Sequence, residues 1–202
     1  EKNQSKSNQR NTNTADTNNQ IIKIDSNQKI DSINVQFFFS YSCVECYYWH
    51  KELEKIKPKL AQAGINFILQ PIIYDEPSDI SAQIFYALKQ TNSVSLHDEI
   101  WDGLANQDWS LNNLKSLAKY IDDIGGNGDK IINHIKNDVN VDNLTFLTPK
   151  YTKQYNIKWP PNVIVSGRYS VSKATINNIS DLPQVLQEAL NAAANDIRNN
   201  KR

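Results

Sequence analysis

The sequence predicts an α/β fold in which a helical segment interrupts a sheet domain. Apolar runs typical of buried strands lie on both sides of the middle of the chain, at 34–39, 65–73 and 162–172. Residues 75–141, between these runs, have helical periodicity throughout. The first two strands flank one helix, and a β-α-β crossover of this kind requires parallel pairing.

The composition sets the broad class of protein. The 202 residues suffice for one domain with an insertion, and 22 basic residues balance 22 acidic ones. This balance gives no general attraction to nucleic acid, so no nucleic-acid partner is expected. No apolar run approaches the roughly twenty residues of a membrane-spanning helix. Residues 1–20 are almost entirely polar and are expected to be disordered, either as a ragged terminus or as a tether to an anchor.

The first ordered elements are expected to be a short strand at Ile21–Ile24 and a buried strand at Asn34–Phe39. A helix then begins at Cys43 and ends at Gly64, a typical C-terminal helix residue. Pro58 lies inside this helical pattern and predicts a kink or a restart just before it. In the strand at 65–73, Pro71 limits where the strand can pair.

The remaining chain is predicted to form more helices, a β-hairpin and a final amphipathic helix. The hairpin strands are Asn162–Ser166 and Tyr169–Ser172, with a turn at Gly167. In the final helix, the spacing of the apolar residues predicts a buried side formed by Leu182, Val185, Leu186 and Leu190. The predicted helices are Ile80–Gln90, Leu96–Ala105, Leu111–Ile124, Lys130–Lys136, Asp142–Tyr155 and Ile179–Ile197.

Both cysteines of the chain, Cys43 and Cys46, lie in one Cys-x-x-Cys motif where the helix begins. A helix N-terminus carries partial positive charge and unpaired N–H groups, which favour a thiolate over a thiol. A structural bridge across two residues would constrain the unfolded chain very little. The motif therefore predicts a redox-active dithiol/disulfide.

Two alternatives to the redox interpretation of the motif remain open. The cysteines can be small buried residues with no chemistry, or they can bind zinc together with His50. Structural zinc usually takes four nitrogen or sulfur ligands, and only His97 and His134, both in the helical segment, remain to complete such a site.

These features together resemble the DsbA-type thiol:disulfide oxidoreductases, thioredoxin-fold proteins with a helical domain inserted in the middle. The resemblance covers about 21–194. It rests on the Phe-Phe-Phe-Ser-Tyr-Ser approach to Cys43, the Cys-x-x-Cys pair, the insertion, and the run Pro161-x-x-x-Val-Ser-Gly-Arg-Tyr. The implied organisation is a disordered tail at 1–20, a thioredoxin-like domain split into 21–75 and 142–198, and a helical insertion at 76–141.

The resemblance also implies roles for the site residues. Cys43 would be the attacking or the attacked sulfur, and Cys46 the shielded resolving thiol. Pro161 would follow a cis peptide bond, and Pro160 and Pro161 would present backbone to an extended substrate by β-addition. The alternative for this segment is an ordinary polyproline turn. No metal and no cofactor other than the Cys43–Cys46 disulfide is expected.

The two residues between the cysteines, Val44 and Glu45, are expected to tune the redox potential. Strongly oxidising members of the resembled family have His where this chain has Glu45, and a carboxylate opposes thiolate formation. Alternatively, Glu45 merely favours the first turn of the helix. The thiol of Cys43 is therefore expected to have a pKa above the roughly 3.5 of DsbA, nearer about 7. The reduction potential is expected to lie below roughly −120 mV.

Two further positions depart from the family pattern. Relatives often place a buried acid where this chain has Phe37, and Phe cannot relay a proton, so slow resolution of mixed disulfides by Cys46 is expected. Pro160 has no N–H to donate to a substrate, so weaker or differently registered binding is expected. Core packing is the simpler role for Phe37.

The expected function is disulfide donation to unfolded or folding secreted proteins. Oxidising spaces such as the bacterial periplasm suit this use, and a membrane oxidase or reductase would recycle a monomeric protein. A reductase or isomerase, which Glu45 favours, and a non-catalytic binding module are the alternatives. His50 is expected to be an exposed residue of the helix, and Trp101 and Trp109 to pack within the insertion. The aromatic residues 47–49, near the thiols, are candidates for a hydrophobic contact surface, and at least one of them is expected to pack in the core.

Overall fold

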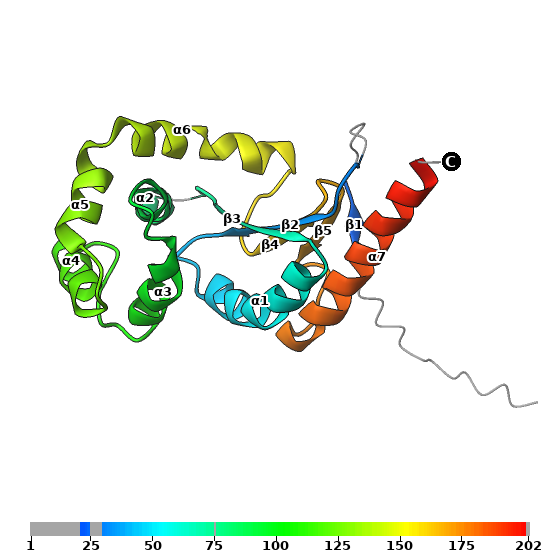
Figure 1. The fold of residues 1–202 in the computed structure, drawn as a ribbon, viewed down its shortest axis with the longest axis horizontal. Coiled ribbons are helices and arrows are strands. Elements are labelled where there is room, and N and C mark those ends of the chain that lie inside the picture. Colours follow the sequence, from blue (N-terminus) through cyan, green and yellow to red (C-terminus); the bar gives the residue numbers. More distant parts are fainter. Residues whose placement is uncertain (1–20, 25–29, 75, 201–202) are drawn as a thin grey trace, which may run out of the picture.

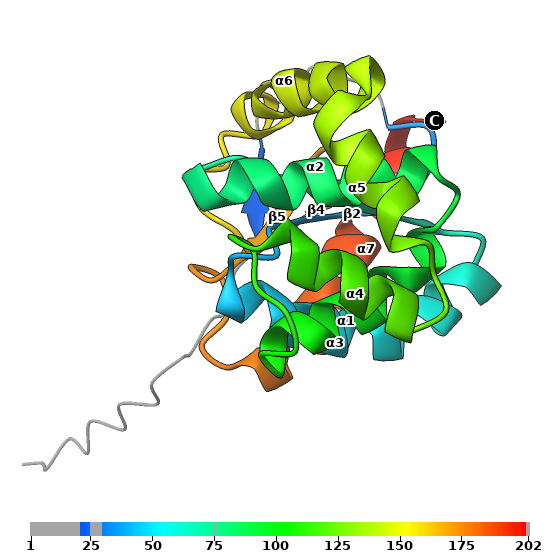
Figure 2. The same cartoon turned by 90° about the vertical axis from the view of Figure 1, so that its left-hand side faces the viewer.

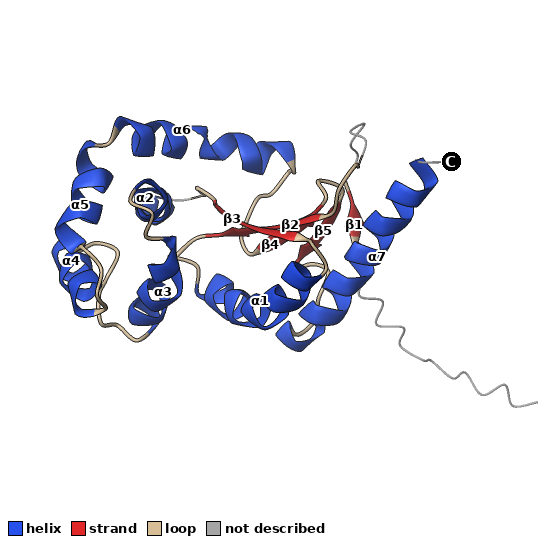
Figure 3. Ribbon diagram, viewed as in Figure 1, coloured by secondary structure: helices blue, strands red, loops and turns tan. Residues whose placement is uncertain are grey.

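The computed structural model describes residues 21–24, 30–74 and 76–200 (Figure 1). A five-stranded mixed sheet, in the order β1-β5-β4-β2-β3, lies beside a group of helices (Figure 3). The predicted tail at 1–20 lies outside the described residues. The strands are β1 Ile22–Lys23, β2 Asn34–Phe39, β3 Asn66–Pro71, β4 Asn162–Val165 and β5 Tyr169–Ser172.

Helices α1 and α7 pack on one face of the sheet, and α2–α6 gather at one side of it, as Figure 2 shows from that side. The α/β fold with a helical insertion between two parts of a sheet domain is confirmed. Among the described residues, no helix is long and apolar enough to cross a membrane. The helices are α1 Val44–Gln62, α2 Glu76–Gln90, α3 His97–Ala105, α4 Leu114–Asp123, α5 Gly128–Asn137, α6 Val139–Gln154 and α7 Leu182–Asn200, with short 3-10 turns at Val94–Leu96 and Ile179–Asp181.

Strand β2 is central and leads directly to the cysteines. It pairs in parallel with β3, with Val35 opposite Phe67, and antiparallel with β4. The parallel pairing predicted from the crossover is confirmed. Strand β3 lies at the edge of the sheet, so the N–H that Pro71 lacks is not needed for pairing with another strand.

The two faces of β2 join two apolar clusters. Val35, Phe37 and Phe39 belong to the large core shared with α1 and α7, whereas Phe38 packs with Ile164 on the opposite face. This alternation follows the two-residue period of a strand. The apolar positions predicted for the last helix, Leu182, Val185, Leu186 and Leu190, are all buried.

Polar caps explain why several helices begin at other residues than the apolar pattern predicts. The Asn113 side chain accepts a hydrogen bond from the N–H of Ser116, so α4 begins after Asn113 and not at Leu111. Asn127 caps α5 in the same way. Asp138 caps α6, which begins before the predicted Asp142, so the predicted insertion boundary at 141 lies inside a continuous helix.

The restart predicted near Pro58 is wrong. Helix α1 runs without interruption through Pro58. Pro58 is exposed, so solvent can reach the Glu54 carbonyl that its missing N–H leaves unbonded. The helix ends where predicted, before Gly64, which has a φ of 69°.

The insertion has its own tight packing. Trp101 and Trp109 are buried as predicted, and the indole N–H of Trp109 donates to the carbonyl of Ile100 at 2.7 Å. Helices α4 and α5 approach so closely that a Cβ on Gly128 would lie 2.1 Å from the carbonyl oxygen of Ala118. Only glycine fits there without a backbone shift.

Candidate active site

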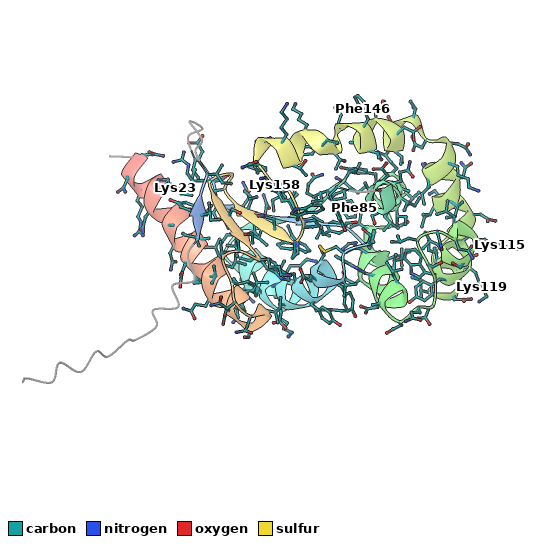
Figure 4. All side chains as sticks on the ribbon, turned by 180° about the vertical axis from the view of Figure 1, so that it is seen from behind. Lys23, Phe85, Lys115, Lys119, Phe146 and Lys158 are labelled. Atoms are coloured by element: carbon teal, nitrogen blue, oxygen red, sulfur yellow. A yellow bond between two sulfur atoms is a disulfide. The ribbon has the colours of Figure 1, made fainter. Side chains whose placement is uncertain are left out.

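Cys43 and Cys46 are joined by a disulfide at the N-terminus of α1, seen as the yellow bond in Figure 4. Cys43 is the N-cap residue, and the backbone N–H of Cys46 donates to its Sγ at 3.1 Å. This N–H and the positive end of the helix dipole stabilise negative charge on Cys43 after the disulfide opens.

The two sulfurs differ in access. Cys43 is half-buried and Cys46 is fully buried. An incoming thiolate can therefore reach Cys43, while Cys46 is shielded. Phe37 is fully buried in the same core, in agreement with its predicted packing role.

Hydrogen bonds fix the turn between β2 and α1. The N–H of Cys43 donates to the carbonyl of Ser40 at 3.1 Å. The N–H of Ser42 donates to Ser81 Oγ of α2 at 3.2 Å, and its hydroxyl lies 3.2 Å from that of Tyr74. The position of Cys43 thus depends on the strand, on α2 and on the segment after β3.

Glu45 and Lys173 form an ion pair beside the disulfide. Lys173 follows β5, so the residue that neutralises Glu45 comes from the far end of the chain. Both side chains are well exposed, and an exposed pair of this kind contributes little to stability. The ion pair instead partly neutralises the negative charge of Glu45 near Cys43.

The cis peptide bond predicted at Pro161 is present between Pro160 and Pro161. This segment lines a surface groove of about 1010 Å³, and Glu45 lies at the border of the same groove. The groove crosses the sheet face opposite α1 and α7, where Ser170 Oγ donates to Asn162 Oδ1 at 2.9 Å. Lys23 and Lys158, labelled in Figure 4, belong to its lining.

Exposed apolar side chains lie near the motif and the groove. Val44, between the cysteines, is 70% exposed, and Tyr48, one turn further on, is 58% exposed. Trp159, which lines the groove, is 67% exposed and packs edge-on against Tyr74. The expected aromatic division holds, since Trp49 is in the core and Tyr48 is not.

The expectation that His50 is exposed is wrong. His50 is 1% exposed, and its Nε2–H donates to Asp98 Oδ1 of α3 at 2.8 Å. Its ring stacks on Trp101, with centroids 5.0 Å apart. The insertion covers this side of α1, and a helical pattern in one segment cannot reveal such coverage.

His97 is buried beside His50. A hydrogen bond of 2.6 Å joins its Nδ1 to the hydroxyl of Tyr41. Burial, together with the charge of His50, lowers the pKa of His97 to about 3. The hydrogen bond from His50 is the main cause of a lowered pKa at Asp98. Atoms of His50, His97 and Asp98 lie within 4.8 Å of one another and could hold a metal ion.

Sequence reasoning did not find Lys173, Asp98 or the burial of His50 against His97, although it weighed both histidines as ligands of one zinc ion with the cysteines. Each depends on a contact between segments at least 47 residues apart, and no local pattern encodes it. The resemblance located the cysteines and the proline segment because these carry local motifs.

The fold and the site together define a class of protein, namely a thioredoxin-like sheet domain with a helical insertion and a Cys-x-x-Cys disulfide. No protein-family model matches the sequence. No curated protein matches it either.

Solved structures identify the fold more narrowly. DsbA of Pseudomonas aeruginosa is similar with a TM-score of 0.71 and 19% identity, over 87% of this chain and 94% of that one. The oxidoreductase DsbA of Xylella fastidiosa has a TM-score of 0.66 and 19% identity, over 77% of this chain and 83% of that one. The oxidoreductase NmDsbA3 of Neisseria meningitidis has a TM-score of 0.65 and 21% identity, over 90% of this chain and 94% of that one. The chain therefore has the DsbA fold, and the resemblance inferred from the motifs is confirmed at the level of the fold.

Proposed function

We propose that this protein is a thiol–disulfide oxidoreductase that passes the Cys43–Cys46 disulfide to folding secreted proteins. The observation that carries the proposal is the asymmetry of the disulfide, in which Cys43 is accessible at a helix N-terminus and Cys46 is fully buried. The DsbA fold and the neighbouring proline segment support it.

The first step is attack of a substrate thiolate on Cys43 Sγ. The bond between Cys43 and Cys46 breaks, its electron pair goes to Cys46 Sγ, and that sulfur takes up a proton. A mixed disulfide between Cys43 and the substrate results. Burial of Cys46 keeps it from reacting with solvent thiols in the meantime.

The second step releases the product. A second substrate thiolate attacks the substrate sulfur of the mixed disulfide, and Cys43 leaves as a thiolate. The N–H of Cys46 and the start of α1 stabilise that thiolate. The substrate has then lost two electrons and two protons. The protein holds both electrons as a Cys46 thiol and a Cys43 thiolate, so one proton is on Cys46 and the other has gone to solvent.

The groove beside Pro160 and Pro161 is the proposed substrate-binding surface. Its volume of about 1010 Å³ suits an extended segment of several residues, and Trp159 offers an apolar contact. Binding through backbone and apolar contacts tolerates many sequences, as a protein that acts on unfolded chains requires.

A disulfide reductase or isomerase is the second candidate, and Glu45 is the observation that favours it. A carboxylate two residues after Cys43 opposes its thiolate and makes the disulfide less oxidising. The ion pair with Lys173 weakens this effect.

We also propose that the protein works as a monomer in the bacterial periplasm. Its N-terminal tail would tether it, and a membrane oxidase or reductase would recycle it.

The test is trapping of a mixed disulfide with a reduced, unfolded secreted protein. The Cys43 thiol of Cys46→Ser is first converted to its mixed disulfide with glutathione; a substrate thiolate should then displace glutathione and leave a covalent complex through Cys43. Cys43→Ser, treated in the same way, should accumulate none. Oxidised wild-type protein should introduce disulfides into the same substrate. No complex with Cys46→Ser would refute the oxidoreductase function. Reduction of insulin and repair of scrambled ribonuclease, with no net oxidation, would favour the second candidate.

A binding module that does not use its cysteines is the remaining alternative. A double Cys43→Ser, Cys46→Ser variant with full biological activity would support that alternative and refute ours.

A further inference from the structure

The buried cluster of His50, His97 and Asp98 contains unpaired polar atoms. Within the described part of the chain, His50 Nδ1 and His97 Nε2 are both buried and have no hydrogen-bond partner. Buried polar atoms are nearly always paired, so each unpaired one requires an explanation such as a bound ion or water. Two such atoms lie here on adjacent imidazole rings, whose centroids are 4.9 Å apart.

The chemistry of the cluster is that of a transition-metal site. Two imidazole nitrogens and one carboxylate oxygen are ligands that zinc accepts, and one such atom from each residue lies within 4.8 Å of the others. Tetrahedral zinc needs its ligand atoms about 3.3 Å apart. Asp98 is 46% exposed, so its side chain can move and can admit an ion from solvent.

His97 is prepared to act as a ligand. Its Nδ1 is bonded to the hydroxyl of Tyr41, which leaves Nε2 as the free nitrogen. Metal-binding histidines commonly hold their second nitrogen in this way, which fixes the ring.

We propose that His50, His97 and Asp98 bind one zinc ion between α1 and α3. The ion would take the place of the proton between His50 Nε2 and Asp98 Oδ1 and would give His97 Nε2 the partner that it lacks, whereas His50 Nδ1 would stay outside the ligand set. Three protein ligands leave the fourth zinc position to water. Phe37, Phe39 and Trp101 surround the histidine rings and limit access of bulk water.

The site would join the two parts of the molecule. His50 belongs to the helix that begins at the cysteines, and His97 and Asp98 belong to the insertion. Bound zinc would therefore fasten α1 to α3, which lie side by side in Figure 1. The cluster contains no cysteine, so the site does not depend on the function of Cys43 and Cys46.

The test uses the full chain in its oxidised form, because the disulfide then prevents the thiols from binding metal. Calorimetric titration with Zn²⁺ should give one ion per chain, and Co²⁺ should give the visible absorption of a tetrahedral site. Asp98→Asn and His97→Phe should each weaken Zn²⁺ binding at least about tenfold and remove the cobalt absorption. Zn²⁺ should raise the melting temperature of the wild type more than that of either variant.

His134→Asn is the matched control. The chain has three histidines, and His134 also bonds an aspartate, Asp138, but it lies on α5 outside the cluster. This variant should bind Zn²⁺ like the wild type. Far-UV circular dichroism confirms folding, and the half-exposed Asp98 gives a variant that keeps the buried rings in place. Absence of stoichiometric binding, or equal affinity in Asp98→Asn, would overturn the proposal.

Discussion

Lys173 pairs with Glu45 across 128 residues of sequence and places a positive charge beside the disulfide. The carboxylate of Glu45 alone would oppose a thiolate at Cys43, and the ammonium of Lys173 partly cancels it. The charge beside the motif therefore depends on a residue outside it.

Replacing Glu45 by Gln should make the protein more oxidising. Removal of the carboxylate favours the Cys43 thiolate, which stabilises the reduced form. Because Lys173 already offsets part of the charge, the thiol pKa should fall by less than about one unit and the potential should rise by at most ~30 mV. Thiolate absorbance against pH and equilibration with glutathione measure the two quantities.

Lys173→Gln should shift both quantities in the opposite direction, since Glu45 then acts without its partner. Glu52→Gln provides the control, because Glu52 pairs with Lys55 on the same helix, two turns from the cysteines. A potential unchanged in both Glu45→Gln and Lys173→Gln would show that the ion pair does not influence Cys43.

Trp159→Ala should slow reaction with a peptide substrate. Large exposed aromatic residues beside a groove often contribute more than 1 kcal/mol to binding, so the second-order rate should fall about tenfold. The rate at which a peptide thiol displaces glutathione from the Cys43–glutathione mixed disulfide of the Cys46→Ser variant gives this value. Phe146→Ala is the control, because Phe146 is 82% exposed on α6 and lies apart from the groove (Figure 4). Equal rate losses in both variants would contradict a role for Trp159 in the groove.

Pro160→Ala should strengthen peptide binding. Alanine restores a backbone N–H that proline lacks, and one net hydrogen bond of about 1 kcal/mol corresponds to roughly fivefold tighter binding. Peptide affinity of the double cysteine variant measures this effect without chemistry. Pro58→Ala in α1 is the control for loss of a proline. A complex in which the wild type already forms two backbone bonds at residue 160 would contradict the expectation.

The sequence predicts well what repeats locally. Apolar runs locate β2–β5, and the motifs around Cys43 and Pro161 locate two parts of the site, because strands and short motifs leave periodic or fixed spacings. Helix starts at Asn113, Asn127 and Asp138 escape the apolar pattern, since single polar side chains set them.

The sequence predicts poorly what depends on packing between distant segments. In the sequence, His50 has the neighbours of an exposed helix residue. In the folded chain α3 covers it, and Asp98 of α3 bonds its ring. Lys173 shows no local sign of its partner at Glu45. The charge and burial of a candidate site can therefore be determined only from the folded chain, although its reactive atoms can be identified from the sequence.

Stability should fall when the pH falls below that at which histidine titrates in an unfolded chain. His97 has a folded-state pKa of about 3, against 6.5 for an unperturbed histidine. Between these values the unfolded chain binds a proton that the folded protein does not, so stability rises with pH across this window and is lost on acidification. The lowered pKa of Asp98 acts in the same direction, with its contribution lost as pH falls below the unperturbed value of 3.8.

The free energy of unfolding should therefore decrease by at most ~1.4 kcal/mol per pH unit below about pH 6.5. Urea unfolding of the oxidised protein with a chelator present, from about pH 7 to about pH 4.5, measures the slope. His97→Phe costs stability at every pH, because the hydroxyl of Tyr41 loses its partner, but it should flatten the slope. His134→Asn is the control for removal of a histidine outside the cluster, because His134 lies on α5 and bonds Asp138. A slope equal in the wild type and in His97→Phe would show that burial of His97 does not couple folding to pH.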